Sequence, residues 1–227
     1  MVSMHPKSIR RNINVPFWLW AVFVFSTLFF IALACAVHFN KTIFFDGTFI
    51  DFTRSVNSPI LTSVMRIVTH LGDKVVVALV TAGIGALLYA KHRCIDLLLL
   101  VTAVTGSAGI NVFLKLFFQR ARPNTAFALI FEDGFSFPSG HAMASAILAV
   151  TVIIIMRNSE RRTFVIVAMS TYMLLVGFSR VYLGVHYPSD VIAGFCVSIA
   201  WAVFVFIAVE HSTILDSLKS RITPRVK

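Results

Sequence analysis

The sequence predicts an all-α integral membrane protein with six transmembrane helices, and three observations support this fold class. Of its 227 residues, 58% are hydrophobic and only 13% are charged, which is far from the composition of soluble proteins. The hydrophobic residues form runs that approach or reach the roughly 20 residues needed to cross about 30 Å of hydrocarbon. Most charged residues stand at the ends of these runs. We therefore expect a single membrane domain over residues 1–227.

Six apolar stretches are the expected spans. They are approximately Pro16–His38, Val75–Ala90, Cys94–Phe118, Gly140–Met156, Thr163–Phe178 and Val191–Val209. The second, fourth and fifth are short, so they must borrow flanking residues, lie where the bilayer is thin or be screened by neighbours. The first follows a basic segment but is too long for a signal peptide, and we interpret it as a retained helix.

The stretch Lys41–Lys74, between the first two spans, mixes phenylalanines and aliphatic residues with charged ones. Its apolar spacing predicts short helices lying in the membrane interface. We expect Asn57-Ser58-Pro59 to break it in two. Two interpretations stay open for this stretch: a lid or lipid entry surface, or a packed structural connection.

The net charge of +10 does not indicate nucleic acid, because no basic stripe is interleaved with aromatic residues. Anionic membrane lipids are the better electrostatic partners, and the sequence gives no sign of an obligate protein partner. The three cysteines, Cys35, Cys94 and Cys196, lie in or beside apolar runs without paired spacing. They indicate neither a disulfide framework nor a zinc motif.

The distribution of lysine and arginine predicts the orientation. With a cytoplasmic N-terminus, 12 of the 20 basic residues lie on the cytoplasmic side, as the positive-inside rule requires. The tails 1–15 and 210–227 are then both cytoplasmic.

Three polar islands interrupt the apolar sequence: Lys115 with Arg122-Pro123, then Pro138-Ser139-Gly140-His141, then Ser179-Arg180 with His186 and Asp190. Charge beside long apolar runs is costly and usually marks function. The same count of spans places all three islands on the extracytoplasmic side, where they can converge on one site.

The cations of these islands suit a phosphate group. Arg122 and Arg180 offer planar forks for bidentate contacts with oxygen, and Lys115 adds a compact third charge. Lys115 and Arg122 lie two helical turns apart if the helix continues between them, and we expect Pro123 to end or redirect that helix.

The second island stands at the start of an apolar run. Ser139 can act there as a helix N-cap, and the backbone amides of Gly140 and His141 can face an anion. Together with the cations, this turn predicts an oxyanion cradle with His141 as a general acid.

The third island pairs a histidine with a carboxylate. Pro188 suits the first turn of the last helix, which puts His186 just outside that helix and Asp190 within its first turn. Asp190 can then accept a hydrogen bond from one ring nitrogen of His186 and leave the other free to attack phosphorus. The pattern predicts a membrane phosphatase with a covalent phosphohistidine intermediate.

Two alternatives were weighed against this prediction. His141, His186 and Asp190 could bind zinc or iron, but the three cations oppose a divalent metal and supply the charge that it would bring. A transporter or lipid-binding scaffold could use the same charged cavity without chemistry, but its site would more naturally lie at the membrane midplane.

The three islands resemble the tripartite signature of the type 2 phosphatidic acid phosphatase superfamily, which includes membrane lipid phosphatases and, more distantly, vanadium haloperoxidases. Lys115 is followed by Arg122-Pro123, Pro138–His141 is unbroken, and Ser179-Arg180 is followed by His186 and Asp190. The resemblance implies that His186 is the nucleophile, Asp190 its orienting partner and His141 the acid. It assigns phosphate binding to Lys115, Arg122, Ser139, Gly140 and Arg180, implies no metal or other cofactor, and predicts inhibition by vanadate.

The resemblance also implies a lipid phosphate substrate. We favour undecaprenyl diphosphate, with phosphatidylglycerophosphate, phosphatidate and lipid A phosphate as alternatives. Selectivity is expected to reside in Thr125–Phe137 and Lys41–Lys74. Within the first of these, Glu132 and Asp133 either repel extra phosphates or simply solvate a loop.

Overall fold

The computed structural model describes residues 16–123 and 128–211, and all regular secondary structure within these ranges is helical. The helices are α1 (Phe17–His38), α2 (Ile43–Ser55), α3 (Pro59–His70), α4 (Lys74–Ala90), α5 (Cys94–Phe118), α6 (Gly140–Ile155), α7 (Arg162–Tyr182) and α8 (Pro188–His211). The all-α prediction is confirmed.

The number of spans agrees approximately with the six predicted. Among the described residues, α1, α5, α7 and α8 are each long and apolar enough to cross a membrane. Helices α3 and α4 meet this requirement only together, as a pair bent by 50°. Helix α6 has 16 residues and is therefore about 24 Å long at 1.5 Å per residue.

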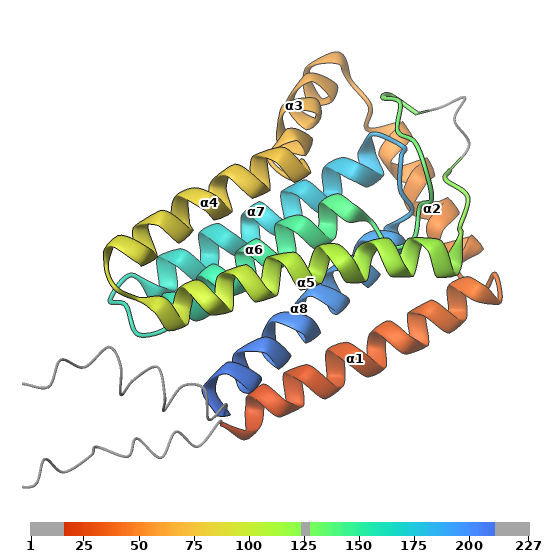
Figure 1. Cartoon of the computed structure of the whole chain (residues 1–227). Helices are drawn as coiled ribbons and strands as arrows, with labels where there is room; N and C mark the ends of the chain where they lie inside the picture. The colour runs from red at the N-terminus through yellow and green to blue at the C-terminus, as the bar shows by residue number, and fades with distance from the viewer. Residues whose placement is uncertain (1–15, 124–127, 212–227) are drawn as a thin grey trace, which may run out of the picture.

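The short helix α6 lies inside the bundle, where neighbouring helices screen it from lipid. It packs against α5, α7 and α8, and ten of its 16 residues are buried. Figure 1 shows α4, α5, α6 and α7 running side by side, with α8 next to α1. A helix so enclosed does not need the full length of a lipid-facing span, because its ends are covered by protein.

The helices alternate in direction, so their connections gather at two opposite ends of the bundle. The start of α1, the end of α8 and the α4–α5 and α6–α7 turns lie at one end in Figure 1. The α3–α4, α5–α6 and α7–α8 connections lie at the other. This arrangement brings the loops that carry the polar islands together.

The stretch between the first two spans breaks where the sequence predicts. Helix α2 ends at Ser55 and α3 begins at Pro59, with the Ser58 hydroxyl accepting the first-turn amide of Leu61. Both helices pack on α7, and α3 continues into α4 through the bend. Helix α3 thus packs on α7 and meets α4 at a bend, and the pair has the combined length and composition of a broken span or a re-entrant loop.

One helix end agrees with the predicted span and another differs from it. Helix α5 does not continue to Arg122; it ends at Phe118, and Gln119 follows in the left-handed region with φ of 45°. Pro123 is therefore not the residue that ends α5. Helix α7 runs on to Tyr182, which places Arg180 within its last turn. Helix α7 extends beyond the predicted Phe178 because the backbone stays helical after the apolar pattern stops.

The packing of α5 on α8 yields a stability prediction. A Cβ atom on Gly106 would lie 2.3 Å from the Trp201 ring, whereas one on Gly109 would meet nothing within 4 Å. We expect Gly106→Ala to destabilise the protein by about 1–3 kcal/mol through overpacking. Gly109→Ala, on the same helix, should be neutral or slightly stabilising because alanine favours helix. Thermal unfolding in detergent measures both, and equal melting temperatures would contradict the prediction.

Candidate active site

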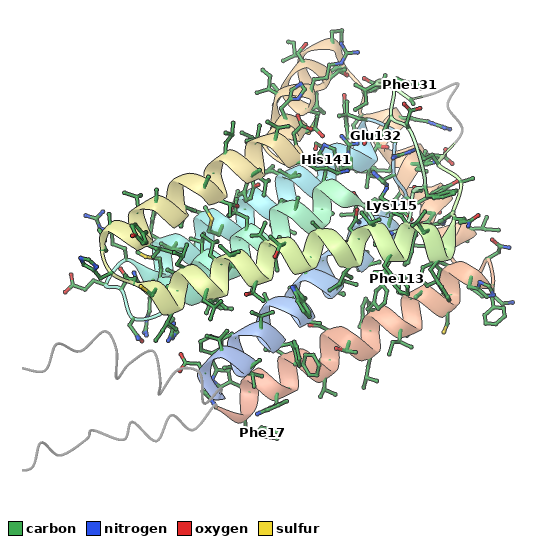
Figure 2. The ribbon with its side chains drawn as sticks, in the orientation of Figure 1. Phe17, Phe113, Lys115, Phe131, Glu132 and His141 are labelled. Atoms are coloured by element: carbon green, nitrogen blue, oxygen red, sulfur yellow. The ribbon has the colours of Figure 1, made fainter. Side chains whose placement is uncertain are left out.

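The three islands meet at one end of the bundle. An Arg122 Nη1 lies 3.2 Å from Nε2 of His186, and the backbone amide of Ser139 donates to the carbonyl of Asp190 at 3.0 Å. Figure 2 shows Lys115, Glu132 and His141 at this same end. Segments separated by up to 75 positions in the chain therefore form one polar site.

The His186 ring is buried and held at Nδ1. That nitrogen lies 3.4 Å from Oδ2 of Asp190 and 3.3 Å from the hydroxyl of Ser136. The Ser136 hydroxyl also donates to Asp190, so it stands between the histidine and the carboxylate. Pro188 begins α8 and Asp190 lies in its first turn, as the sequence predicts. The other ring nitrogen, Nε2, faces Arg122.

Asp190 is fully buried, with a relative exposure of 0%, and its oxygens are well supplied with donors. Besides Ser136, Oδ2 accepts the backbone amide of Tyr187 at 2.9 Å. Oδ1 accepts Nη1 of Arg120 at 2.5 Å. A buried carboxylate is tolerated only with such partners.

Arg120 joins Asp190 to a second buried carboxylate, Asp46 of α2. Its Nη2 lies 2.7 Å from Oδ2 of Asp46, and its guanidinium stacks over the Tyr187 ring at 4.0 Å. Asp46 also accepts the backbone amide of Ser189 at 3.0 Å. The pair Asp46–Arg120 thereby fixes the start of α8 against α2.

The three cations predicted to bind phosphate all line the site, but each already has partners. Arg122 donates to the carbonyls of Asp133, Gly134 and Val185. Lys115 donates to the carbonyl of Phe135. These contacts hold the loop before α6 against the end of α5.

Arg180 is almost completely buried, and two groups contact its guanidinium. Nη1 donates to the Thr69 hydroxyl at 2.6 Å, and Nη2 pairs with Glu132. Its Nε has no hydrogen-bond partner in residues 16–123 and 128–211. An unsatisfied buried donor of this kind is available to an anion.

Glu132 lies between Arg122 and Arg180, two of the residues predicted to bind phosphate. Its carboxylate pairs with Arg180 and lies 3.8 Å from Nη2 of Arg122. Burial alone would raise the pKa of Glu132, but Arg180, with smaller contributions from His141 and Arg122, lowers it below its usual value. Glu132 is therefore ionised at neutral pH and takes an anion's place beside these guanidiniums, rather than only solvating a loop.

The second island forms the start of α6. The hydroxyl of Ser139 accepts the amide of Ala142 at 3.4 Å, so Ser139 is the N-cap that the sequence predicts. A Cβ on Gly140 would come within 3.2 Å of Oδ1 of Asn111, which favours glycine there. His141 follows in the first turn, and its Nε2 lies 2.7 Å from Oδ1 of Asp73.

The electrostatics of the site leave the nucleophile candidate neutral. Burial lowers the pKa of His186 to about 4, and the charges of Arg180 and Arg122 act in the same direction, while Asp190 opposes them. At neutral pH the ring therefore keeps a lone pair.

Four residues of this network were not singled out from the sequence: Asp46, Asp73, Arg120 and Ser136. Arg120 stands two residues before Arg122, and Asp46 is a carboxylate among phenylalanines. Both features could have indicated a role in the polar site. Ser136 and Asp73 carry no comparable signal, because only the folded loops bring them to the histidines.

An apolar cavity of about 300 Å³ lies beside the site, between α4, α5 and α6. Gly140, Asn111 and Lys74 line it together with valine, alanine and isoleucine side chains. Within the part of the chain that the structure describes, no three His, Cys, Asp or Glu side chains form a group suited to a metal ion.

An all-helical membrane fold with cations and two histidines at one end defines a class of phosphate-handling membrane proteins, and comparisons with known proteins agree with it. Residues 96–214 match the PAP2 superfamily. Phosphatidylglycerophosphatase B of Bacillus subtilis is 34% identical over 173 residues, covering 74% of this chain and 85% of the relative.

A second sequence and a solved structure from Bacillus subtilis are also similar. The undecaprenyl-diphosphatase BcrC is 34% identical over 106 residues, covering 44% of this chain and 52% of its own. The crystal structure of a transmembrane PAP2 type phosphatidylglycerolphosphate phosphatase aligns with a TM-score of 0.74 at 30% identity, covering 90% of this chain and 98% of the other. The chain belongs to the PAP2 superfamily, and it is a membrane phosphatase of that family.

The Arg120 bridge gives a prediction about stability. Arg120→Met leaves Asp46 and Asp190 buried without their cation, and breaking such a pair costs about 3–5 kcal/mol. We expect a large fall in melting temperature, measured in detergent, and a partial recovery in Arg120→Met/Asp46→Asn. Lys91→Met, on an exposed residue at the opposite end of the bundle, is the matched control. A melting temperature for Arg120→Met equal to that of Lys91→Met would contradict the assignment.

Proposed function

We propose that this protein hydrolyses the terminal phosphate of a membrane lipid through a phosphohistidine at His186. One observation carries the proposal. The buried His186 ring is held at Nδ1 by Ser136 and Asp190, while Nε2 faces the Arg122 guanidinium. An imidazole fixed in this way presents one nitrogen as a nucleophile beside a cation that can bind phosphoryl oxygens.

The first chemical step forms a bond between Nε2 of His186 and phosphorus and breaks the bond to the lipid oxygen. Arg122, Arg180 and Lys115, with Ser139 and the Gly140 amide at the start of α6, stabilise the phosphoryl oxygens. His141 gives a proton to the leaving oxygen. In the second step water attacks phosphorus, the N–P bond breaks, and a proton of the water returns to His141.

The proposed nucleophile must be neutral, and this sets the direction of the pH dependence. The pKa of His186 is lowered to about 4, so the lone pair on Nε2 is present above that pH and is lost as the pH falls through it. Activity governed by this group would therefore persist into mildly acidic conditions.

A lipid substrate is supported by the surroundings of the site. The apolar cavity between α4, α5 and α6 reaches Gly140 at the start of the predicted phosphate cradle. An acyl or prenyl chain in this cavity would lie among apolar side chains while its phosphate meets the cations. The positive-inside distribution of basic residues supports an extracytoplasmic site with both termini cytoplasmic.

Between substrates, we propose a lipid phosphomonoester of the phosphatidylglycerophosphate type. Phosphatidylglycerophosphatase B of Bacillus subtilis, 85% of which aligns with this chain, is named for this activity. The ionised Glu132 at the cradle also disfavours the additional charge of a diphosphate, because like charges repel. Undecaprenyl diphosphate, favoured by the sequence alone, remains the second candidate because shorter matches include undecaprenyl-diphosphatases.

The substrate proposal is tested by phosphate release from purified protein in detergent. Phosphatidylglycerophosphate, phosphatidate, undecaprenyl diphosphate and lipid A phosphate are compared at equal concentration. The highest kcat/KM is expected for phosphatidylglycerophosphate, and a higher value for undecaprenyl diphosphate would overturn the order.

The mechanism predicts complete loss of turnover in His186→Ala, because within the described residues no other imidazole contacts Arg122. The wild type should form a phosphoenzyme that is labile in acid and stable in alkali, and His186→Ala should not. An unchanged melting temperature shows that the variant is folded. EDTA should leave wild-type activity intact; a loss that zinc restores would support a metal mechanism instead.

The position of Glu132 predicts a competition with anionic ligands. In Glu132→Gln the ion pair with Arg180 is lost, so vanadate and orthophosphate no longer displace a carboxylate. We expect inhibition by both to strengthen by about tenfold, equivalent to about 1.4 kcal/mol. Asp133→Asn is the matched control, because Asp133 contacts Arg122 through its backbone carbonyl and should change inhibition less. Weaker inhibition in Glu132→Gln would contradict the competition.

A further inference from the structure

The turn between α3 and α4 directs a carboxylate at the predicted general acid. Asp73 is the residue before α4, yet its side chain makes no cap hydrogen bond to that helix. Its Oδ1 lies 2.7 Å from Nε2 of His141, and its Oδ2 lies 2.7 Å from Nδ1 of His70. The carboxylate is thus committed to two histidines rather than to the helix that it precedes.

Three contacts from α7 and α6 hold this turn against the site. The Tyr172 hydroxyl donates to the carbonyl of Leu71 at 2.8 Å, and Arg180 donates to Thr69. Gly72 packs so closely that a Cβ would lie 2.5 Å from Val176 and 3.4 Å from the Cβ of His141. Contacts from α7 and α6 therefore hold the turn that carries Asp73, in addition to its own ion pairs.

We propose that Asp73 is a positioning residue for His141, with His70 as the second partner of its carboxylate. The inference rests on the proposed phosphatase mechanism. With Nε2–H directed at Asp73, the ring offers Nδ1 to the leaving oxygen; Nδ1 has no hydrogen-bond partner among the described residues. Asp73 and Glu132 also supply negative charge near the His141 ring, and this charge opposes the positive charge of Arg180. That negative charge favours the protonated ring that a general acid needs.

The protons balance without an outside donor. When the P–O bond to the lipid breaks, its electron pair stays on the leaving oxygen, which takes the proton from Nδ1 of His141. When water replaces the N–P bond, a proton of that water returns to Nδ1, and His186 regains its lone pair. Throughout the cycle, the proton on Nε2 stays between His141 and Asp73.

Substrates with different leaving groups distinguish the positioning role of Asp73 from a purely structural one. A lipid alkoxide is strongly basic and needs the acid, whereas p-nitrophenolate leaves without a proton. Loss of general acid catalysis costs about 10²–10⁴ in rate where the proton is needed. A damaged phosphate cradle would instead slow both substrates equally.

The test compares Asp73→Asn and Asp73→Ala with wild type on a lipid phosphomonoester and on p-nitrophenyl phosphate. We expect kcat for the lipid to fall by about 100-fold and kcat for the aryl ester to fall far less, with vanadate affinity kept. His141→Gln should show the same split, and His70→Gln a smaller one. Asp51→Asn, which removes an exposed carboxylate of α2, is the matched control and should behave as wild type.

Equal losses on the two substrates in Asp73→Asn, or no loss on the lipid, would overturn the inference. Failure of the proposed function has a different signature, which is turnover by His186→Ala. An inactive His186→Ala together with an unchanged alkyl-to-aryl ratio in Asp73→Asn would reject the role of Asp73 alone.

Discussion

The buried carboxylate of Asp190 constrains the arrangement of the whole site. A negative charge with no solvent exposure requires donors from the protein, and they come from three segments: the segment after α5, the loop before α6 and the α7–α8 connection. The donor after α5, Arg120, also donates to Asp46 of α2. Removing any one of these segments would leave a charge or a donor unpaired. The position of the first turn of α8 therefore depends on the loops around it as much as on its own helix.

The cationic side of the site is held by the same means. Arg122, Arg180 and Lys115 repel one another, and protein oxygens compensate for this: carbonyls for Arg122 and Lys115, and Glu132 and Thr69 for Arg180. For the phosphate binding that we propose, these donors are oriented in advance, which lowers the reorganisation cost of binding. The same compensation makes Glu132 a competitor for the ligand.

The sequence predicts most of this fold because its signals are local. Apolar length gives the helices, and Pro59 and Pro188 mark two helix starts that the structure shows at those residues. The apolar run also gives the end of α5 at Phe118, but the left-handed conformation of Gln119 that follows could not be predicted, because no glycine or asparagine stands there. The bend between α3 and α4 likewise depends on how Gly72 packs against Val176 of α7.

The site residues likewise fall into those that the sequence predicts and those that it does not. The cations and the two histidines stand in ordered blocks, so their chemistry can be inferred from spacing. Ser136, Arg120, Asp46 and Asp73 act through contacts between distant segments, at separations such as the 68 positions between Asp73 and His141. Residue type alone does not predict such pairings, because many Asp or Ser residues could serve as well.

The two histidines also show how similar partners can support opposite roles. Both rings contact a carboxylate, but Asp190 is already paired with Arg120, whereas the ion pairs of Asp73 within the described residues are with histidines only. Burial keeps the His186 ring neutral, with its pKa lowered to about 4, although Asp190 acts in the opposite direction. The charge of Asp73 remains available to His141. Environments that differ in this way can divide a pair of like groups into nucleophile and acid, which is the division that we propose for His186 and His141.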